Sequence, residues 1–550
     1  MKLNFLLTTL LFQITFFASA QKQKTSVIVP RPKLVVGIVV DQMRWDYLYR
    51  FYDRYQEGGF KRLLSEGFSC DNTNIDYLPT ETAPGHACIY TGSVPAIHGI
   101  TGNFFYVQAS GRYRYCTEDS TVQSVGTISK AGLMSPANLL ASTITDELKL
   151  ATNFRSKVIG VALKDRGSIL PAGHTPDGAY WFDDITGNWI TSTYYMPRLP
   201  EWVKHFNDQK LAENYLARPW NTLYALSTYQ QSTPDNVPYE QTYLKEKEPV
   251  FPHQFQSIEK NNFSRIRSNP YGNTFTLDFA KSAIDAEQLG KDHIPDFLTI
   301  SLSSPDYIGH QFGPNSVEVE DTYLRLDKEL ASFFTYLDTE AGKGNYTLFL
   351  TADHGVAHNA GFASQHKLPA GIWNAPARQQ ELNQLLSKKY QVNNLVLSME
   401  SYQVNLNKAS LVANSLDAIA VKQDCIDWLA KQEGVVFAVD MKRIHQTAIP
   451  AGLREQMING YNSERSGDIK LILKPGWYSS ITGAGSTHGV NGQYDTHIPL
   501  VIMGWGIKKG TLNRQTHMTD ISATLAALLH IQAPNGCMGQ VISEALDIHR

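Results

Sequence analysis

Hydrophobic residues along the chain gather in short continuous runs, not in strict alternation with polar ones. Five such runs are rich in Val, Ile, Leu or Phe and lead into a charged residue or a glycine: 33–40, 157–163, 296–302, 346–350 and 498–503. Continuous apolar runs of this length are typical of strands that are covered on both faces of a sheet. They predict the core strands of an α/β protein.

Helical periodicity lies between and beyond these runs. Residues 317–337 place Tyr, Leu and Phe side chains at helical spacing, and residues 45–64 and 519–530 have similar patterns. Strands that alternate with helices indicate a doubly wound, mostly parallel sheet with helices on both faces.

Two stretches depart from this alternation. Residues 171–290 are rich in Tyr, Trp, Pro and Asn, and residues 361–485 are irregular and mixed in character. We expect residues 21–550 to form a single α/β domain that these two insertions decorate as irregular cap segments.

The first twenty residues have the pattern of a secretory signal peptide. Lys2 precedes a mostly apolar run, Phe5 to Phe17, and Ala18-Ser19-Ala20 supplies the small residues of a cleavage site. The run is short for a membrane-spanning helix, and no later stretch is long and apolar enough to span a bilayer. We predict that residues 1–20 are removed and that the mature protein is exported without a membrane anchor, to the periplasm.

Composition removes some classes of function. The 550 residues have a formal net charge of −3, so no overall basic field supports nucleic-acid binding. The five cysteines form no Cys-x-x-Cys pair, which disfavours a thiolate zinc site. Export makes disulfides possible, but the sequence does not indicate which cysteines pair.

The segment TETAPGHACIYTG, residues 80–92, has the punctuation of a short helix. Pro84 lies near its expected start and Gly92 just past its expected end, which puts Thr82 at the helix N-terminus. A threonine there is commonly a cap, because its hydroxyl accepts a hydrogen bond from a free backbone N–H. From this segment alone capping is favoured, and the alternative is a nucleophile.

Acids and histidines follow several of the predicted strands. In open parallel sheets, ligands bind beyond the carboxyl ends of the strands, so these residues are candidates for one site. They are Asp41, Asp306, His310, Asp353 and His354, with His488 in a glycine-flanked loop. Carboxylates and imidazoles are typical zinc ligands, and there are enough of them for two metal ions.

Taken together, these segments resemble the alkaline phosphatase superfamily of two-zinc phosphoryl-transfer enzymes. The nearer resemblance is to the PafA-type bacterial alkaline phosphatases, in which the nucleophile is a threonine. The matching segments are VVDQMRWD (39–46), TETAPGHACIYTG (80–92), PAIHGITGNFFY (95–106), LKDRGSILPAGH (163–174), SSPDYIGHQFG (303–313), TADHG (351–355) and GSTHG (485–489). They follow the family's order over nearly the whole mature chain.

The resemblance implies an assignment for each candidate residue. One zinc ion would be bound by Asp306, His310 and His488. The other would be bound by Asp41, Asp353 and His354, together with Thr82 as the attacking ligand. The phosphoryl oxygens would be bound by Asn103, Lys164 and Arg166.

The implied activity is hydrolysis of small-molecule phosphate monoesters through a phosphothreonine intermediate, with release of inorganic phosphate. Lys164 and Arg166 suit the extra charge of a monoester. Both side chains would point into the site if the strand geometry continued beyond residue 163.

Two rival functions stay open on the sequence alone. A phosphodiesterase or nucleotide pyrophosphatase of the same superfamily would share the zinc ligands, the threonine and the asparagine, and would differ in the Lys164–Arg166 pair. A catalytically silent exported binding protein is the second rival, with Trp181, Trp189 and Trp202 as a sugar-stacking surface. A sulfatase is disfavoured because Thr82 stands where those enzymes need a cysteine or serine.

Overall fold

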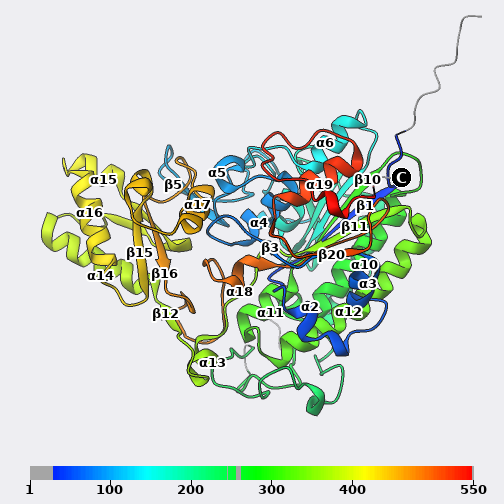
Figure 1. The fold of residues 1–550 in the computed structure, drawn as a ribbon, viewed down its shortest axis with the longest axis horizontal. Coiled ribbons are helices and arrows are strands. Elements are labelled where there is room, and N and C mark those ends of the chain that lie inside the picture. Colours follow the sequence, from blue (N-terminus) through cyan, green and yellow to red (C-terminus); the bar gives the residue numbers. More distant parts are fainter. Residues whose placement is uncertain (1–28, 244–245, 256–261, 548–550) are drawn as a thin grey trace, which may run out of the picture. The chain divides into compact units, whose positions relative to one another are not determined.

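The computed structural model describes residues 29–243, 246–255 and 262–547, so the expected signal peptide lies outside the described residues. From Pro32 onward the described chain forms one compact unit. At its centre is a ten-stranded sheet, which we call the central sheet (Figure 1). Its strands, in order across the sheet, are β20 (Gly510–Leu512), β2 (Phe68–Cys70), β19 (Leu500–Gly504), β11 (Tyr346–Thr351), β1 (Leu34–Val40), β10 (Asp296–Leu302), β7 (Val158–Ala162), β8 (Gly178–Asp183), β9 (Asn188–Ser192) and β6 (Ser124–Val125).

The middle of the central sheet is parallel and fully buried. Strand β1 pairs in parallel with both β10 and β11, and Leu34 lies opposite Asp296 and Tyr346. Strands β7 and β8 continue the parallel arrangement. Every residue of β1, β7, β10 and β11 is buried, which confirms the prediction from their continuous apolar runs.

The predicted strand 498–503 differs from the others. It is divided at Pro499 into β18 (His497–Ile498), which pairs in a small separate sheet, and β19, which lies antiparallel to β11. Proline has no N–H to donate to a ladder, so the division falls at a residue that cannot extend either pairing.

Helices cover both faces of the central sheet. Figure 1 shows α4, α6 and α19 on one side of the strands and α3, α10 and α12 on the other. Their bounds are α3 (Phe60–Glu66), α4 (Thr82–Thr91), α6 (Ile144–Ala151), α10 (Tyr271–Glu287), α12 (Val317–Leu337) and α19 (Asp520–Leu529). The helices predicted at 317–337 and 519–530 are confirmed. All five cysteines are unpaired, and all but Cys537 are buried.

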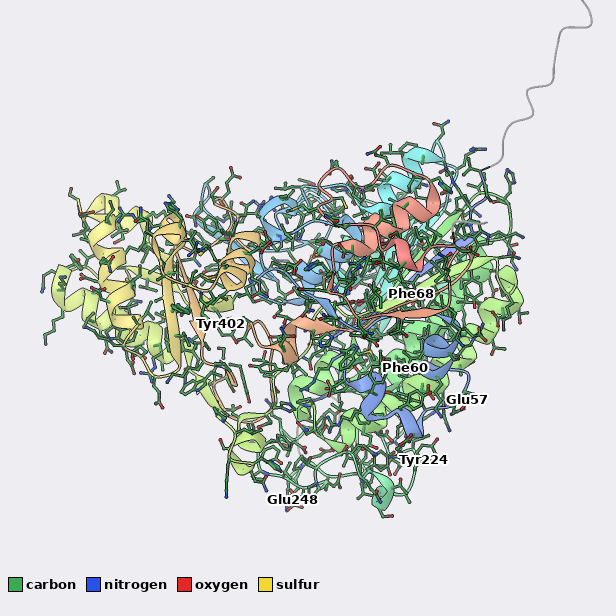
Figure 2. The ribbon with its side chains drawn as sticks, viewed as in Figure 1. Glu57, Phe60, Phe68, Tyr224, Glu248 and Tyr402 are labelled. Atoms are coloured by element: carbon green, nitrogen blue, oxygen red, sulfur yellow. The ribbon has the colours of Figure 1, made fainter. Side chains whose placement is uncertain are left out.

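Residues 45–64 do not form the single helix that their pattern suggests. They form α2 (Tyr47–Arg50), a 3-10 turn (Tyr52–Arg54) and α3. The carboxylate of Asp327 accepts hydrogen bonds from the N–H groups of Gln56, at 2.6 Å, and Phe60, at 2.8 Å. The carboxylate of Asp327 in α12, and not a preceding helical turn, therefore accepts from these N–H groups, so the chain bends before Phe60. Phe60 is labelled in Figure 2.

Part of the stretch 171–290 belongs to the core and not to a cap. Trp181 lies in β8 and Trp189 in β9, and both side chains are buried. The Trp189 ring stacks on Phe279 of α10 at 4.2 Å between ring centroids. The Trp202 indole is partly buried and donates its N–H to Glu287. These tryptophans do not form an exposed sugar-stacking surface.

The stretch 361–485 contains an ordered lobe, which we call the second lobe and define as residues 371–479. It has its own sheet, in the order β13 (Val396–Ser398), β14 (Gln403–Leu406), β16 (Ile469–Leu473) and β15 (Val435–Asp440). Helices α14 (Ala375–Tyr390) and α16 (Ala418–Leu429) pack on a separate hydrophobic core that includes Leu382, Val421 and Leu471. Short strands between helices blur both periodicities in the sequence, which explains the expectation of irregular structure.

Helix α4 packs unusually close to the segment that follows β11. A Cβ atom on Gly85 would lie 2.5 Å from the carbonyl oxygen of Asp353, closer than real contacts allow. Only glycine therefore permits this approach, although alanine is favoured in helices by about 1 kcal/mol.

We expect Gly85→Ala to destabilise the protein by roughly 1–3 kcal/mol, because helix and loop must move apart. The control is Gly452→Ala in α17 (Ala451–Asn459), where an added Cβ meets no atom within 4 Å. Denaturant unfolding of both variants measures the difference. Equal stability of Gly85→Ala and wild type would contradict the close packing.

Candidate active site

The candidate residues meet at the carboxyl ends of the parallel strands. Asp41 follows β1 directly, and Asp353 and His354 follow β11. After β10 the chain enters α11 (Ser304–Phe312), which contains Asp306 and His310. Because β1, β10 and β11 are parallel neighbours, these residues share one edge of the central sheet.

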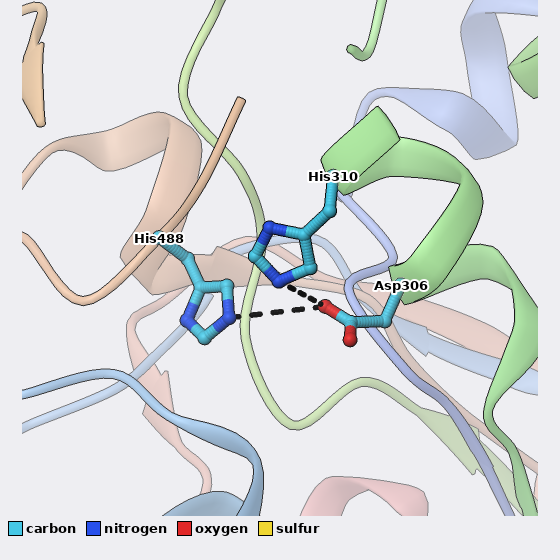
Figure 3. A group of neighbouring side chains, drawn as sticks. All are labelled: Asp306, His310 and His488. Atoms are coloured by element: carbon cyan, nitrogen blue, oxygen red, sulfur yellow. Dashed lines mark ion pairs between the residues drawn. The ribbon is translucent and has the colours of Figure 1, made fainter. Parts of the chain in front are cut away.

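Asp306, His310 and His488 form a first group (Figure 3). The Nε2 atom of His310 lies 3.1 Å from Oδ1 of Asp306, and Nε2 of His488 lies 3.8 Å from the same oxygen. Asp306 and His310 share a face of α11 because they are four residues apart. His488 enters from the loop that follows the second lobe.

Asp41, Asp353 and His354 form a second group beside the first, and Asp41 and His354 also group with Asp306 of the first set. Nε2 of His354 is 3.7 Å from Oδ1 of Asp41 and 3.5 Å from Oδ2 of Asp353. All three of these atoms are buried and have no hydrogen-bond partner. Unpaired buried polar atoms are costly, and a cation bound beside these three atoms would lower that cost. This donor set fits a zinc ion.

The three imidazoles are oriented as metal ligands are. In each ring Nδ1 donates to a backbone carbonyl, which leaves the Nε2 lone pair facing the site in the neutral form. The Nδ1-to-oxygen distances are 2.9 Å for His310 to Ser486, 2.9 Å for His354 to Gly355 and 2.6 Å for His488 to Thr80. Burial lowers the pKa of His354 and of His488, whereas at His310 the carboxylate of Asp306 outweighs burial and raises the pKa.

Thr82 is the first residue of α4, as the sequence predicts, and Gly92 ends that helix in the left-handed conformation. The cap position belongs to Glu81, whose side chain makes no capping hydrogen bond to the helix. The Thr82 hydroxyl lies 3.5 Å from Nζ of Lys164. One turn later, His86 Nδ1 lies 2.9 Å from the Thr82 carbonyl oxygen and 3.3 Å from Oδ2 of Asp353. The capping role that the local sequence favours for Thr82 is therefore wrong.

Lys164 lies between the two groups of ligands. Its Nζ donates to Oδ2 of Asp41 and to Oδ2 of Asp306, both at 2.6 Å. Burial would lower the pKa of Lys164, but Asp306 and Asp41 raise it well above its usual value, so the ammonium stays charged. Two buried carboxylates thus share one ammonium, and Asp353 lies beside them, so the cluster favours a further cation.

The electrostatics of the carboxylates differ between the groups. Burial, with a further contribution from Asp353, raises the pKa of Asp41 well above its usual value. Although burial also favours the neutral form of Asp306, His310 and Lys164 hold the pKa of Asp306 well below its usual value. Asp306 is therefore ionised, and Asp41 needs additional positive charge to be so.

Lys164 and Arg166 do not continue the strand, so their side chains are not placed by strand alternation. Strand β7 ends at Ala162, and Lys164 and Arg166 are the N-cap and second residue of α7 (Asp165–Ala172). Nη1 of Arg166 donates to the Tyr115 hydroxyl at 3.0 Å, and that hydroxyl donates to Oδ1 of Asp165 at 2.8 Å. Tyr115 therefore orients Arg166.

Asn103 lies beside the start of α4. Its Oδ1 accepts from the N–H of Ala83 at 2.9 Å, and its own N–H donates to Oε2 of Glu81 at 2.8 Å. Because a backbone N–H only donates, the side-chain atom that faces Ala83 is the oxygen. The Nδ2 donor of Asn103 is then left for another partner near Thr82.

Sequence reasoning missed three residues of this region. Gln42 directly follows Asp41 and His86 lies one helical turn after Thr82, both within the recognised segments, but no residue pattern around either reveals its contacts. Asp495 forms a third group with His354 and His488, and its Oδ2 accepts from the N–H of Val490 at 2.8 Å. Asp495 follows none of the central strands, so only the folded chain reveals it.

Comparison with known proteins gives consistent matches. Residues 35–495 match the family described as type I phosphodiesterase / nucleotide pyrophosphatase. A protein of Myroides odoratus named calcium-transporting ATPase is 55% identical over 549 residues, which cover 99% of this chain and 100% of that protein. The alkaline phosphatase PhoV of Synechococcus elongatus is 52% identical over 553 residues, with the same two coverages.

The alkaline phosphatase PafA of Elizabethkingia meningoseptica is 51% identical over 528 residues, which cover 95% of this chain and 96% of that protein. A crystal structure of wild-type PafA matches the fold with a TM-score of 0.93 at 50% identity, covering 94% of this chain and 100% of that one. Among the described residues, no helix is both long and apolar enough to cross a membrane.

Because the family model covers most of the chain and PafA and PhoV are more than half identical to it, the chain belongs to the type I phosphodiesterase / nucleotide pyrophosphatase family and, within it, to the PafA-type alkaline phosphatases.

Proposed function

We propose that this alkaline phosphatase is a two-zinc hydrolase of phosphate monoesters that works through a phosphothreonine at Thr82 and releases inorganic phosphate. The observation that most supports the metal is the set of buried, unpartnered atoms Asp41 Oδ1, Asp353 Oδ2 and His354 Nε2. We further propose that the chain is exported to the periplasm, as its first twenty residues suggest.

Each group of ligands would hold one zinc ion. Asp306, His310 and His488 would bind one, and Asp41, Asp353 and His354 would bind the other together with the Thr82 oxygen. When bound, the two ions act as Lewis acids that lower the pKa of a nucleophile and neutralise the charge of a leaving oxygen. Mixed carboxylate and imidazole donors favour zinc over calcium or magnesium, which prefer oxygen ligands.

The protein would divide the reaction into two displacements at phosphorus. First the Thr82 oxygen, having given up its proton to solvent, bonds to phosphorus, and the substrate's oxygen leaves with the bonding electrons and takes up a proton from solvent. Then water loses a proton and attacks phosphorus, the bond from Thr82 to phosphorus breaks, and the Thr82 oxygen regains a proton. Because Lys164 is protonated, it stabilises negative charge on the Thr82 oxygen and does not take the hydroxyl proton. The N-terminus of α4 adds partial positive charge at the same place.

The charge of the remaining side chains supports a monoester. A monoester exposes three non-bridging oxygens and up to two negative charges, and a diester exposes two oxygens and one charge. Lys164, Arg166 and the Nδ2 donor of Asn103 would supply two positive charges and an additional hydrogen bond to a phosphoryl group on Thr82; Lys164 Nζ lies 3.5 Å from the Thr82 hydroxyl. This set exceeds what a diester can use, so hydrolysis of diesters is less well supported.

Two other functions, hydrolysis of ATP and binding without catalysis, can be compared with the residues of this site. The terminal phosphoryl group of ATP presents the same three oxygens as a monoester, so the name of the Myroides relative is compatible with hydrolysis at this site. A silent binding protein would not need a threonine hydroxyl beside two groups of candidate metal ligands.

Metal content gives the first test. Purified protein should contain about two zinc ions per chain, and activity toward an aryl phosphate should disappear on chelation and return with zinc. His488→Ala and Asp353→Asn should lower both zinc content and turnover, while His366→Ala, an exposed histidine elsewhere, should change neither. Full turnover by metal-free protein would refute the proposal.

The nucleophile gives the second test. Thr82→Ala should lower kcat/KM by at least about a thousandfold, because the attacking oxygen is lost. Thr82→Ser keeps that oxygen and should retain much of the activity. Acid-quenched wild-type protein should show a phosphoryl group on Thr82 by mass spectrometry, and Thr82→Ala none. Near-normal turnover by Thr82→Ala would mean that water attacks the substrate directly.

Substrate charge gives the third test. Arg166→Ala should lower kcat/KM for an aryl phosphate by roughly a hundredfold and for the matching methyl diester much less. Tyr115→Phe, which removes only the hydroxyl that orients Arg166, should cost roughly tenfold on the monoester alone. The surface variant Arg514→Ala is the control, since that arginine pairs with Glu544 on the exterior. Equal losses on the two substrates would favour a diesterase.

A further inference from the structure

Gln42 has a conformation that is rare for its residue type. It follows Asp41 directly, its side chain is 2% exposed, and its φ is +68°. A non-glycine residue in the left-handed region costs on the order of 1 kcal/mol, and such residues persist where the surrounding contacts fix them. The contacts of Gln42 therefore need an explanation.

Gln42 donates one hydrogen bond to each group of ligands. Its main-chain N–H reaches Oδ1 of Asp353 at 3.1 Å, and its side-chain Nε2 reaches Oδ1 of Asp306 at 2.6 Å. Asp306 belongs to the first group and Asp353 to the second. The left-handed turn at Gln42 directs the main-chain donor toward one carboxylate while the side chain extends to the other.

The hydrogen bond from the Gln42 N–H determines which carboxylate oxygen of Asp353 can face the second group. Oδ1 of Asp353 accepts from the N–H of Gln42 and also from the N–H of His354, at 3.0 Å. Oδ2 has no hydrogen bond of good geometry: it lies 3.3 Å from Nδ1 of His86, which is bonded to the Thr82 carbonyl, and 3.5 Å from His354 Nε2. The main chain at Gln42 thus leaves Asp353 as a one-oxygen donor toward the second group.

Gly309 provides the space that the Gln42 amide occupies. It lies in α11 between Asp306 and His310, and a Cβ atom there would be 1.9 Å from Oε1 of Gln42. Any side chain at position 309 would displace the amide. Glycine at this helical position is less favourable than alanine by about 1 kcal/mol, so the space it leaves for the amide has a cost in helix stability.

We propose that Gln42 is a positioning residue that fixes the two ligand groups relative to each other, and that Gly309 serves the same purpose by making room for its amide. The inference rests on the proposed two-zinc site. Hydrogen bonds to ligating side chains typically contribute 10- to 100-fold in metal affinity. Losing the amide should therefore weaken zinc binding without removing any ligand.

Two single variants and their double variant test this role. Gln42→Gly accepts φ +68° without strain, so it keeps the N–H bond to Asp353 and loses only the amide. Gly309→Ala keeps the amide but displaces it. Each should weaken zinc binding by roughly 10- to 100-fold, measured by competition with a fluorescent zinc chelator. The double variant should be no weaker than either single one, because both remove the same contact.

The melting temperature of the zinc-free proteins separates positioning from general destabilisation. Gln42→Gly should melt close to wild type without zinc, whereas a purely structural role would lower that temperature and leave zinc affinity unchanged. Gly452→Ala again serves as the control for glycine replacement in a helix. Wild-type zinc affinity in both single variants, or additive losses in the double variant, would overturn the role of Gln42.

The outcome for wild type distinguishes this inference from the proposed function. If wild type binds no zinc, the two-zinc function fails and the role of Gln42 fails with it. If wild type binds about two ions and the variants bind them equally well, only the role of Gln42 is refuted.

Discussion

Buried negative charge at the carboxyl edge of the central sheet is the constraint on which the rest of the site depends. Asp41 follows β1, Asp353 follows β11 and Asp306 lies in α11. Their carboxylates meet in the interior, where water does not solvate them. Uncompensated charge at such depth would cost several kcal/mol per ion, so every neighbouring feature supplies compensation. Lys164 donates to two of the carboxylates, Gln42 donates to Asp306 and Asp353, and the imidazoles lie within ion-pair distance.

The second lobe contributes to the site through main-chain support rather than through catalytic groups of its own. Arg465 donates to the carbonyl oxygens of Gly99, at 2.8 Å, and Asn138, at 2.6 Å, and its own carbonyl accepts from Thr101 at 3.0 Å. These bonds hold the segment that leads to Asn103. The lobe also supplies Tyr402, labelled in Figure 2, whose hydroxyl donates to the carbonyl oxygen of His488 at 3.3 Å.

Features that depend on local sequence could be predicted, and features that depend on distant partners could not. The buried parallel strands were predictable because both of their faces are covered, so their residues are apolar without interruption. The seven candidate ligand and nucleophile residues were chosen from strand ends and recognisable segments, and they stay a prediction. The break before Phe60 depends on Asp327, the orientation of Arg166 depends on Tyr115, and Asp495 reaches the site only through the fold. No local pattern contains these relations.

The position of His488 in the chain has a consequence for how the protein matures. Synthesis proceeds from the N-terminus, and domains fold as their residues emerge. Asp306 and His310 precede the second lobe, whereas His488 follows it, so an incomplete chain has only two members of the first group. Truncated products and unfinished chains thus lack one ligand of the proposed two-zinc site. If the two-zinc site is as proposed, hydrolytic activity is confined to molecules whose synthesis has passed the whole second lobe.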